Sequence, residues 1–287
     1  MLESWITRLY HRQAGSQRTI RRLWMIVCTA IAILIVSTLT HPLLAQPDSN
    51  QSPSLQLPDS AIHSLPILLE DWRDPTNTGD YFDQISSFGF GYLVWSHFPI
   101  RIYINPKPDD ITSHLTEEQL KNWYQAIELA VQEWNQFIPF EISDSPDQAD
   151  IIVLAQTPPL RWSTAPQSSS QDATEVASEP EQLPIPRAQT AETTFKVALE
   201  EVNGQTVMRQ KYTIQLSPSQ SLNYLEATAR HELGHALGIW GHSPVQEDAL
   251  YFSQVRTPPS ISTRDINTLK KIYQQPTQLG WPLIASE

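Results

Sequence analysis

Apolar residues follow two different periods in the first half of the chain. They occupy every second position from 98 to 104 until Pro106 ends the run, which is typical of a half-buried strand. Between residues 116 and 138 they recur every three or four positions, and Thr116 with Gln119 forms a capping-box signature at the start. The pattern therefore predicts a strand followed by a long amphipathic helix.

Shorter apolar runs predict further strands. Residues 140–143 and 150–155 have the length and the composition of strands. Residues 193–201 and 205–216 are expected to form a hairpin, because Asn203-Gly204 between them favours a tight turn. This alternation of strands and helices predicts an α+β fold, arranged as an α/β sandwich.

A second helical segment carries the candidate chemistry. Residues 223–237, NYLEATARHELGHAL, are strong helix formers, and Asn223 with Glu226 makes a capping-box-like start. His231 and His235 are four residues apart, so a helix places them on one face with about 5–6 Å between their Cβ atoms. Two imidazoles at this spacing can hold one zinc ion at roughly 2.0–2.1 Å each. Leucine and alanine lie opposite, so the helix has a packing face and a metal face.

Two more residues complete the candidate site. Glu232 stands between the two histidines, where a carboxylate can act as general base for a zinc-bound water whose pKa is lowered to about 7. His242 belongs to the same cluster, because three of the eight histidines of the chain fall between residues 231 and 242, which indicates a metal site. The competing interpretation is that His242 is a surface histidine and that the motif occurs by chance.

Composition excludes several classes of function. The 31 acidic and 19 basic side chains give a net charge of −12, which repels nucleic acids, so no nucleic-acid partner is expected. Cys28 is the only cysteine, so the rest of the chain has no disulfide and no thiolate ligand or nucleophile. A metal-bound water is therefore favoured over a cysteine nucleophile.

The N-terminal residues are typical of an export signal. An uncharged, mostly apolar run at residues 23–39 follows a basic segment that carries Arg8, Arg12, Arg18, Arg21 and Arg22. We expect residues 1–45 to be a signal peptide cleaved near Ala45, or a membrane anchor that is retained. The remainder is then secreted, periplasmic or extracellular, and it meets a membrane only through this segment.

Composition also divides the rest of the chain. Residues 46–65 are expected to be a flexible linker, residues 66–275 the folded domain, and residues 276–287 a C-terminal tail. Residues 157–190 are rich in proline and serine and predict an insertion, either a disordered surface segment or a lid over the substrate. We expect the protein to be a monomer.

The histidine motif resembles that of a known enzyme family. His231-Glu232-x-x-His235-x-x-Gly238 is similar to the metzincin signature, and HELGHALG followed by His242-Ser243 resembles the matrixin branch of zinc metallopeptidases. In that family a third histidine lies three residues after the glycine. Here Gly241 occupies that place and His242 comes one residue later. The resemblance makes His242 the expected third ligand, with Asp248 or Glu247 as the fallback. Gly241 is expected to absorb the extra residue because glycine tolerates positive φ.

The resemblance extends over about residues 90–275. Asp248-Ala249-Leu250-Tyr251 matches the turn that passes beneath the zinc ion in matrixins, with Leu250 in place of methionine. Ser262 to Leu269 resembles the start of the family's last helix. The resemblance implies a metzincin or zincin catalytic domain, in which a twisted, mostly parallel sheet places an edge strand over a long active-site helix.

The resemblance also implies a function. His231, His235 and His242 would bind one catalytic zinc ion, and Glu232 would take a proton from the attacking water and pass it to the leaving amine. A protein or peptide substrate would lie extended along the edge strand. Tyr251 and Phe252 are expected either in the wall of a specificity pocket or in the core.

Several family features are missing, and two other functions stay open. No histidine lies between His114 and His231, so a second, structural zinc has no ligands. The only cysteine, Cys28, lies within the predicted signal, so no cysteine switch is expected. No loop has a clear run of carboxylates, so a calcium site is not indicated, although the acidic residues of the insertion and nearby backbone carbonyls could bind a calcium ion weakly. The alternatives are a catalytically inactive zinc-binding pseudoprotease of the cell envelope, and a structural envelope protein with an incidental motif.

Overall fold

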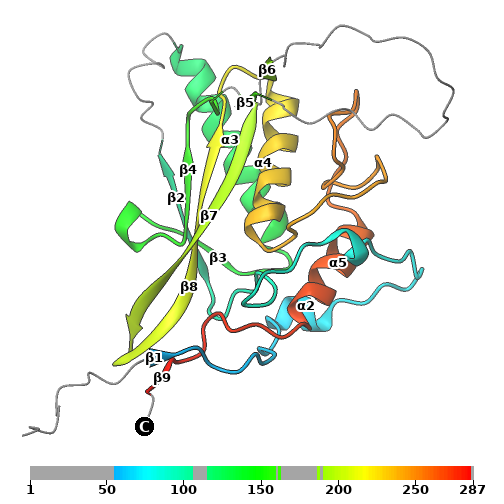
Figure 1. Cartoon of the computed structure of the whole chain (residues 1–287). Coiled ribbons are helices and arrows are strands. Elements are labelled where there is room, and N and C mark those ends of the chain that lie inside the picture. Colours follow the sequence, from blue (N-terminus) through cyan, green and yellow to red (C-terminus); the bar gives the residue numbers. More distant parts are fainter. Residues whose placement is uncertain (1–54, 106–114, 160, 163–185, 188–189, 286–287) are drawn as a thin grey trace, which may run out of the picture. The chain divides into compact units, whose positions relative to one another are not determined.

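The computed structural model describes residues 55–105, 115–159, 161–162, 186–187 and 190–285 (Figure 1). The predicted signal or anchor at residues 1–45 lies outside the described residues, as does most of the predicted insertion at residues 157–190. Within that insertion, two short strands pair antiparallel, β5 (Arg161–Trp162) and β6 (Pro186–Arg187). None of the helices formed by the described residues combines the length and the hydrophobicity that crossing a bilayer requires.

A five-stranded, mostly parallel sheet forms the centre of the fold, in the order β3-β2-β4-β8-β7 (Figure 1). Only the pair β7 and β8 is antiparallel, and β7 is an edge strand. The mixed α and β content and the mostly parallel sheet confirm the coarse prediction from the sequence. The strands are β2 (Ile100–Asn105), β3 (Phe140–Ile142), β4 (Ile151–Leu154), β7 (Ala191–Val202) and β8 (Gln205–Leu216).

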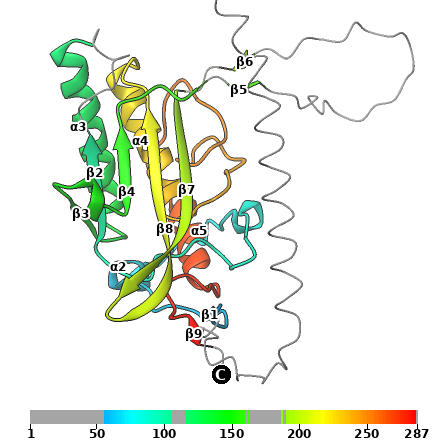
Figure 2. The ribbon, with the colours of Figure 1, turned by 60° about the vertical axis from the view of Figure 1, so that its left-hand side comes forward.

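The two longest strands form the hairpin that the sequence predicts. β7 and β8 pair along twelve residues each, and Figure 2 shows the hairpin reaching beyond the other strands of the sheet. The turn has positive φ at both central residues, 53° at Asn203 and 78° at Gly204, as expected for a type I′ turn. This turn twists in the same sense as the strands, so the pairing continues to the hairpin tip.

Two helices, α3 (Glu117–Trp134) and α4 (Leu222–Ala236), pack against each other on one face of the sheet (Figure 1). The capping box predicted at Thr116 and Gln119 is present at the start of α3. At α4 the prediction is wrong, because the helix begins one residue before Asn223 and its N-cap is Ser221. The carbonyl of Ser221 accepts the first helical hydrogen bonds, so Asn223 already lies in the first turn.

Aromatic side chains fix α4 through its own backbone carbonyls. Each donor is almost fully buried, so its polar atom needs a partner inside the protein. The bonds join Trp134 Nε1 to Arg230 O (2.9 Å), Trp95 Nε1 to Ala236 O (2.9 Å), and Tyr273 Oη to Leu237 O (3.0 Å). The helix that carries both motif histidines is thereby held at its middle and at its C-terminal end.

A third long helix and several short elements complete the fold. Helix α5 (Thr263–Tyr273) begins with a capping box between Ser262 and Asp265, and Ser262 is its N-cap. The shorter elements are α2 (Ile67–Asp71), β1 (Leu55–Gln56), β9 (Ile284–Ala285), and the 3₁₀ helices η2 (Phe82–Gln84) and η4 (Pro146–Gln148).

The packed unit extends beyond residues 66–275. Strand β1 pairs with β9, Ala61 and Thr277 exchange backbone hydrogen bonds, and His63 stacks on Trp281 at 4.3 Å between ring centroids. Parts of the expected linker and of the expected tail therefore hold each other. Backbone pairing needs no apolar side chains, so the polar composition of these segments gave no indication of it.

Gly238→Ala tests the fit of the chain just after α4. Gly238 has a φ of 113°, and a Cβ there would lie 2.1 Å from the carbonyl oxygen of Leu93. We expect the substitution to lower the free energy of unfolding by about 3 kcal/mol or more, measured by urea denaturation. Gly89→Ala is the control, because a Cβ at Gly89 has no atom within 4 Å. That variant should stay within about 1 kcal/mol of the parent, and equal stability of both variants would contradict the expected clash.

Candidate metal centre

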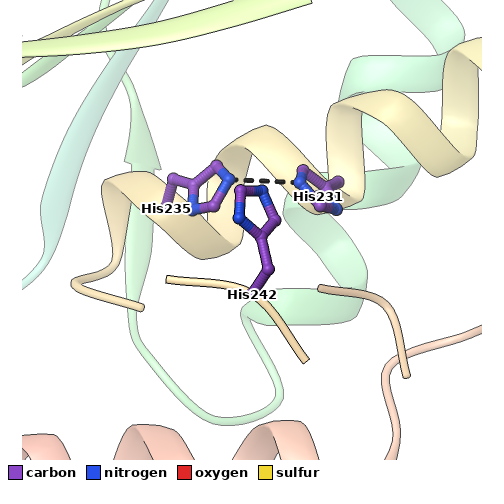
Figure 3. A group of neighbouring side chains, drawn as sticks. All are labelled: His231, His235 and His242. Carbon is purple, nitrogen blue, oxygen red and sulfur yellow. Dashed lines mark hydrogen bonds between the residues drawn. The ribbon is translucent and has the colours of Figure 1, made fainter. Parts of the chain in front are cut away.

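Three imidazole rings converge beside the last turns of α4 (Figure 3). His231 and His235 project from the helix, and His242 reaches them from the loop that follows it. One nitrogen from each of the three rings can be chosen so that all lie within 4.8 Å of one another. The structure thus brings together the three histidines that the sequence singled out, in a group able to hold a metal ion.

Backbone carbonyls set the tautomers of the two helical histidines. His231 Nδ1 lies 2.8 Å from the carbonyl oxygen of Ala249, and His235 Nδ1 lies 2.8 Å from that of Ile239. A carbonyl can only accept, so each Nδ1 carries the hydrogen and each neutral ring keeps a lone pair on Nε2. Such second-sphere hydrogen bonds are the usual way in which a metal-binding histidine is oriented.

The facing lone pairs fit a cation. His231 Nε2 and His235 Nε2 are 3.1 Å apart, where two lone pairs repel each other. Tetrahedral zinc with nitrogen ligands at 2.0–2.1 Å separates those nitrogens by about 3.3 Å. The spacing and the all-nitrogen donor set therefore suit zinc, although the geometry alone shows only a site able to bind a metal ion.

The environment of His235 and His242 disfavours the protonated form of each ring. Desolvation by burial lowers the pKa of His235 well below its ordinary value, and the neighbouring His231 and His242 lower it further. Desolvation, followed by the influence of His231, lowers the pKa of His242 to about 4. A histidine must be deprotonated at the nitrogen that binds a metal, so these pKa shifts favour metal binding at neutral pH.

Close backbone contacts place His242. A Cβ at Gly241 would lie 2.1 Å from the carbonyl oxygen of Gln84, so only glycine fits where this loop meets η2. The expected reason, a positive φ at Gly241, is wrong, because the left-handed residue in this loop is Gly238. The backbone N–H of Ser86 also donates to the carbonyl of Trp240 at 3.0 Å. The extra residue before His242 is thus absorbed by a loop docked against the segment around η2.

Trp240 gives this loop a rigid wall. Its ring lies edge-on to Phe195 of β7 with 4.9 Å between centroids, and 5.8 Å from the ring of His235. The indole is half-buried, and it lines a hollow that also contains the three histidines. No sequence pattern distinguished Trp240 as part of the site.

The turn at residues 248–251 lies directly beneath α4. Leu250 is fully buried, and a Cβ at Gly234 would come within 2.6 Å of its side chain. The carbonyl of Leu250 accepts from the backbone N–H of Ser243 at 2.8 Å, which ties the turn to the residue after His242. Leu250 therefore packs where the resemblance places a methionine, and Gly234 provides the space that it needs.

The two fallback ligands lie outside the histidine group. Asp248 is buried and accepts hydrogen bonds from Ser243 Oγ at 2.5 Å, Ser262 Oγ at 2.7 Å and Arg264 Nε at 3.0 Å. Both carboxylate oxygens of Asp248 therefore accept hydrogen bonds that stabilise the turn. Glu247 is exposed and is likewise absent from the group of converging ligands.

Asp265 of α5 supports the same turn, a role that the sequence analysis missed. Its carboxylate is fully buried and accepts from Tyr81 Oη at 2.5 Å and from the backbone N–H groups of Ala249 and Ser262, both at 2.8 Å. Burial raises the pKa of Asp265, and these hydrogen bonds act in the opposite direction. The capping-box spacing of Ser262 and Asp265 was the available signal.

Glu232 lies beside the metal group without belonging to it. Its side chain is buried, and desolvation raises the pKa of its carboxyl group, against the influence of His231 and of Thr193. The hydroxyl of Thr193 donates to Glu232 Oε2 at 2.6 Å. Nothing in the sequence pattern distinguished this threonine from an ordinary strand residue.

Two hollows meet at the candidate site. Both are lined by Ala191, His231 and Glu232, so these residues lie at their junction. One measures about 160 Å³ and is lined further by residues of α4 and of the chain after the turn, including Tyr224, Thr228, Tyr251, Phe252 and Val255. The other measures about 400 Å³ and is bounded by Ser86 and Trp240.

Tyr251 and Phe252 line the wall of the smaller hollow. The side chain of Phe252 is 65% exposed, so it is not part of the core.

Neither the comparison with protein families nor the comparison with curated proteins finds a match for this chain. The chemistry of the site must therefore be inferred from its own residues.

His242→Ala tests whether the three histidines form one metal site. Loss of a ligand should weaken zinc binding on the order of 100-fold or more, measured by competition with a chromophoric chelator. His63→Ala is the control, because His63 bonds the carbonyl of Leu279 instead, and zinc affinity should match that of the parent. Equal zinc affinity in His242→Ala and the parent would exclude His242 as a ligand.

Proposed function

We propose that this protein is a zinc-dependent metalloendopeptidase of the metzincin type, which hydrolyses peptide bonds of extracytoplasmic proteins. The observation that carries this proposal is the buried carboxylate of Glu232 beside three converging imidazoles, at the junction of two hollows. A purely structural metal site has no need of an adjacent buried carboxylate that stays outside the ligand group.

The donor set suits a catalytic rather than a closed structural site. Three histidines leave a fourth tetrahedral position for water or substrate, whereas structural zinc sites use four protein ligands. When bound, a zinc ion polarises the scissile carbonyl and lowers the pKa of a coordinated water to about 7. Ligands on α4 are held rigidly by the carbonyls of Ala249 and Ile239, which favours a fixed geometry.

Glu232 supplies the proton transfers. Its raised pKa makes the carboxylate a stronger base than an exposed glutamate. Glu232 takes one proton as the water oxygen attacks the carbonyl carbon, and it gives this proton to the amide nitrogen as the carbon–nitrogen bond breaks. The products are a carboxylic acid and an amine, which become a carboxylate and an ammonium when the remaining water proton passes from the acid to the amine. Glu232 returns to its starting state.

Strand β7 offers a place for an extended peptide. Among the described residues it pairs with β8 on one side only, so the other edge of its backbone can accept a further strand. Ala191 at its start lines both hollows, so a peptide bound along this edge would pass the site. Side chains on either side of the scissile bond would then enter the two hollows.

The expected substrates lie outside the cytoplasm because residues 1–45 have the pattern of an export signal. The second candidate is a zinc-binding protein of the cell envelope that does not cleave. Leu250 in place of methionine and the displaced His242 favour that alternative, and intact Glu232 argues against it.

Glu232→Gln separates the two functions. The substitution keeps the shape of the side chain but removes the base, so we expect casein hydrolysis to fall about 10²- to 10⁴-fold while zinc content stays near one ion per chain. Glu226→Gln, the same change on the same helix but outside both hollows, should retain activity. A parent protein that binds zinc and hydrolyses no broad substrate would instead identify the non-cleaving zinc protein.

A further inference from the structure

The carboxylate of Glu232 is oriented from the edge strand. Thr193 Oγ1 lies 2.6 Å from Glu232 Oε2 and 3.2 Å from the backbone carbonyl of Glu232. A hydroxyl has one hydrogen to donate, and the shorter distance assigns it to the carboxylate. Among the described side chains, Thr193 alone hydrogen-bonds this carboxylate.

Thr193 is a polar residue between two apolar neighbours on one face of β7. Its neighbours on the same face of β7, Ala191 and Phe195, pack against the core, and successive side chains of a strand alternate between faces. A hydroxyl on that face needs a polar partner, and Glu232 is the partner that the fold provides. The backbone of Thr193 is fixed by the ladder to β8, where it lies opposite Ile214.

We infer that Thr193 is a positioning residue, which holds one oxygen of Glu232 so that the other faces the attacking water. The terminal torsion of a glutamate is broad, so a carboxylate without such a partner samples many orientations. Fixing Oε2 leaves Oε1 for proton transfer. Misplacement of a catalytic group by about 1 Å costs on the order of 100-fold in rate, so a single hydrogen bond of this kind has a measurable effect.

The same strand would also align the substrate. If the peptide adds to the edge of β7, its scissile bond and the base are both positioned from residues 191–193. The orientation of the base is then tied to the register of the bound peptide. A change at Thr193 should therefore affect the chemical step while peptide binding along the backbone is retained.

Thr193→Val and Thr193→Ser provide the test, which rests on the proposed function. Valine keeps the β-branched shape without the donor, and serine keeps the donor without the methyl group. We expect Thr193→Val to lower kcat about 10- to 100-fold, with KM within twofold and zinc content unchanged. Thr193→Ser should restore kcat to within about threefold of the parent.

Thr213→Val is the matched control. Thr213 lies on β8, between Tyr212 and Ile214, which face the core, so its side chain lies on the opposite face of the sheet. This variant should retain the parent kcat. If Thr193→Val does not fold, Thr193→Ala replaces it in the comparison with Thr193→Ser.

Two results would overturn the role of Thr193 alone. These are a kcat of the valine variant within twofold of the parent, and an equal loss in the valine and serine variants. A parent protein that binds zinc and hydrolyses no peptide would overturn the proposed function as well, so the two failures are distinguishable.

Discussion

The buried carboxylate of Asp265 connects the start of α5 to two other segments of the chain, one at Tyr81 and one at Ala249. It accepts the hydroxyl of Tyr81 and the backbone N–H groups of Ala249 and Ser262, and the carbonyl of Ala249 in turn holds Nδ1 of His231. A buried negative charge is stable only with such donors. The orientation of a candidate metal ligand therefore depends on a carboxylate that lies outside the histidine group.

Close contacts at glycines determine the conformation of the loop after α4. Gly238 lies against the carbonyl of Leu93 and Gly241 against that of Gln84, each at a distance that excludes a side chain. Gly234 serves the same purpose within the helix, where Leu250 packs beneath it. Because backbone meets backbone at these points, His242 is placed by rigid contacts and not by its own side-chain preferences.

Local sequence patterns predicted the helices, the strands and the hairpin turn. Contacts between residues far apart in the sequence could not be predicted in this way. The spacing of His231 and His235 on a helix, the hairpin turn at Asn203-Gly204 and the alternation in β2 depend on neighbours within a few residues, so the sequence alone revealed them. The partner of Glu232 depends on how β7 crosses α4, which no local pattern encodes. The pairing of residues 55–61 with the segment after 276 was missed for the same reason.

The C-terminal end of α4 has an electrostatic consequence for a bound cation. Its last carbonyls, at Ala236 and Leu237, accept hydrogen bonds from the uncharged side chains of Trp95 and Tyr273. These donors exclude water from the helix end but bring no positive charge to cancel the partial negative charge of the helix macrodipole. His235 lies in that last turn. The helix therefore favours a positive ion at its end, and the buried aromatic rings protect this attraction from screening by salt.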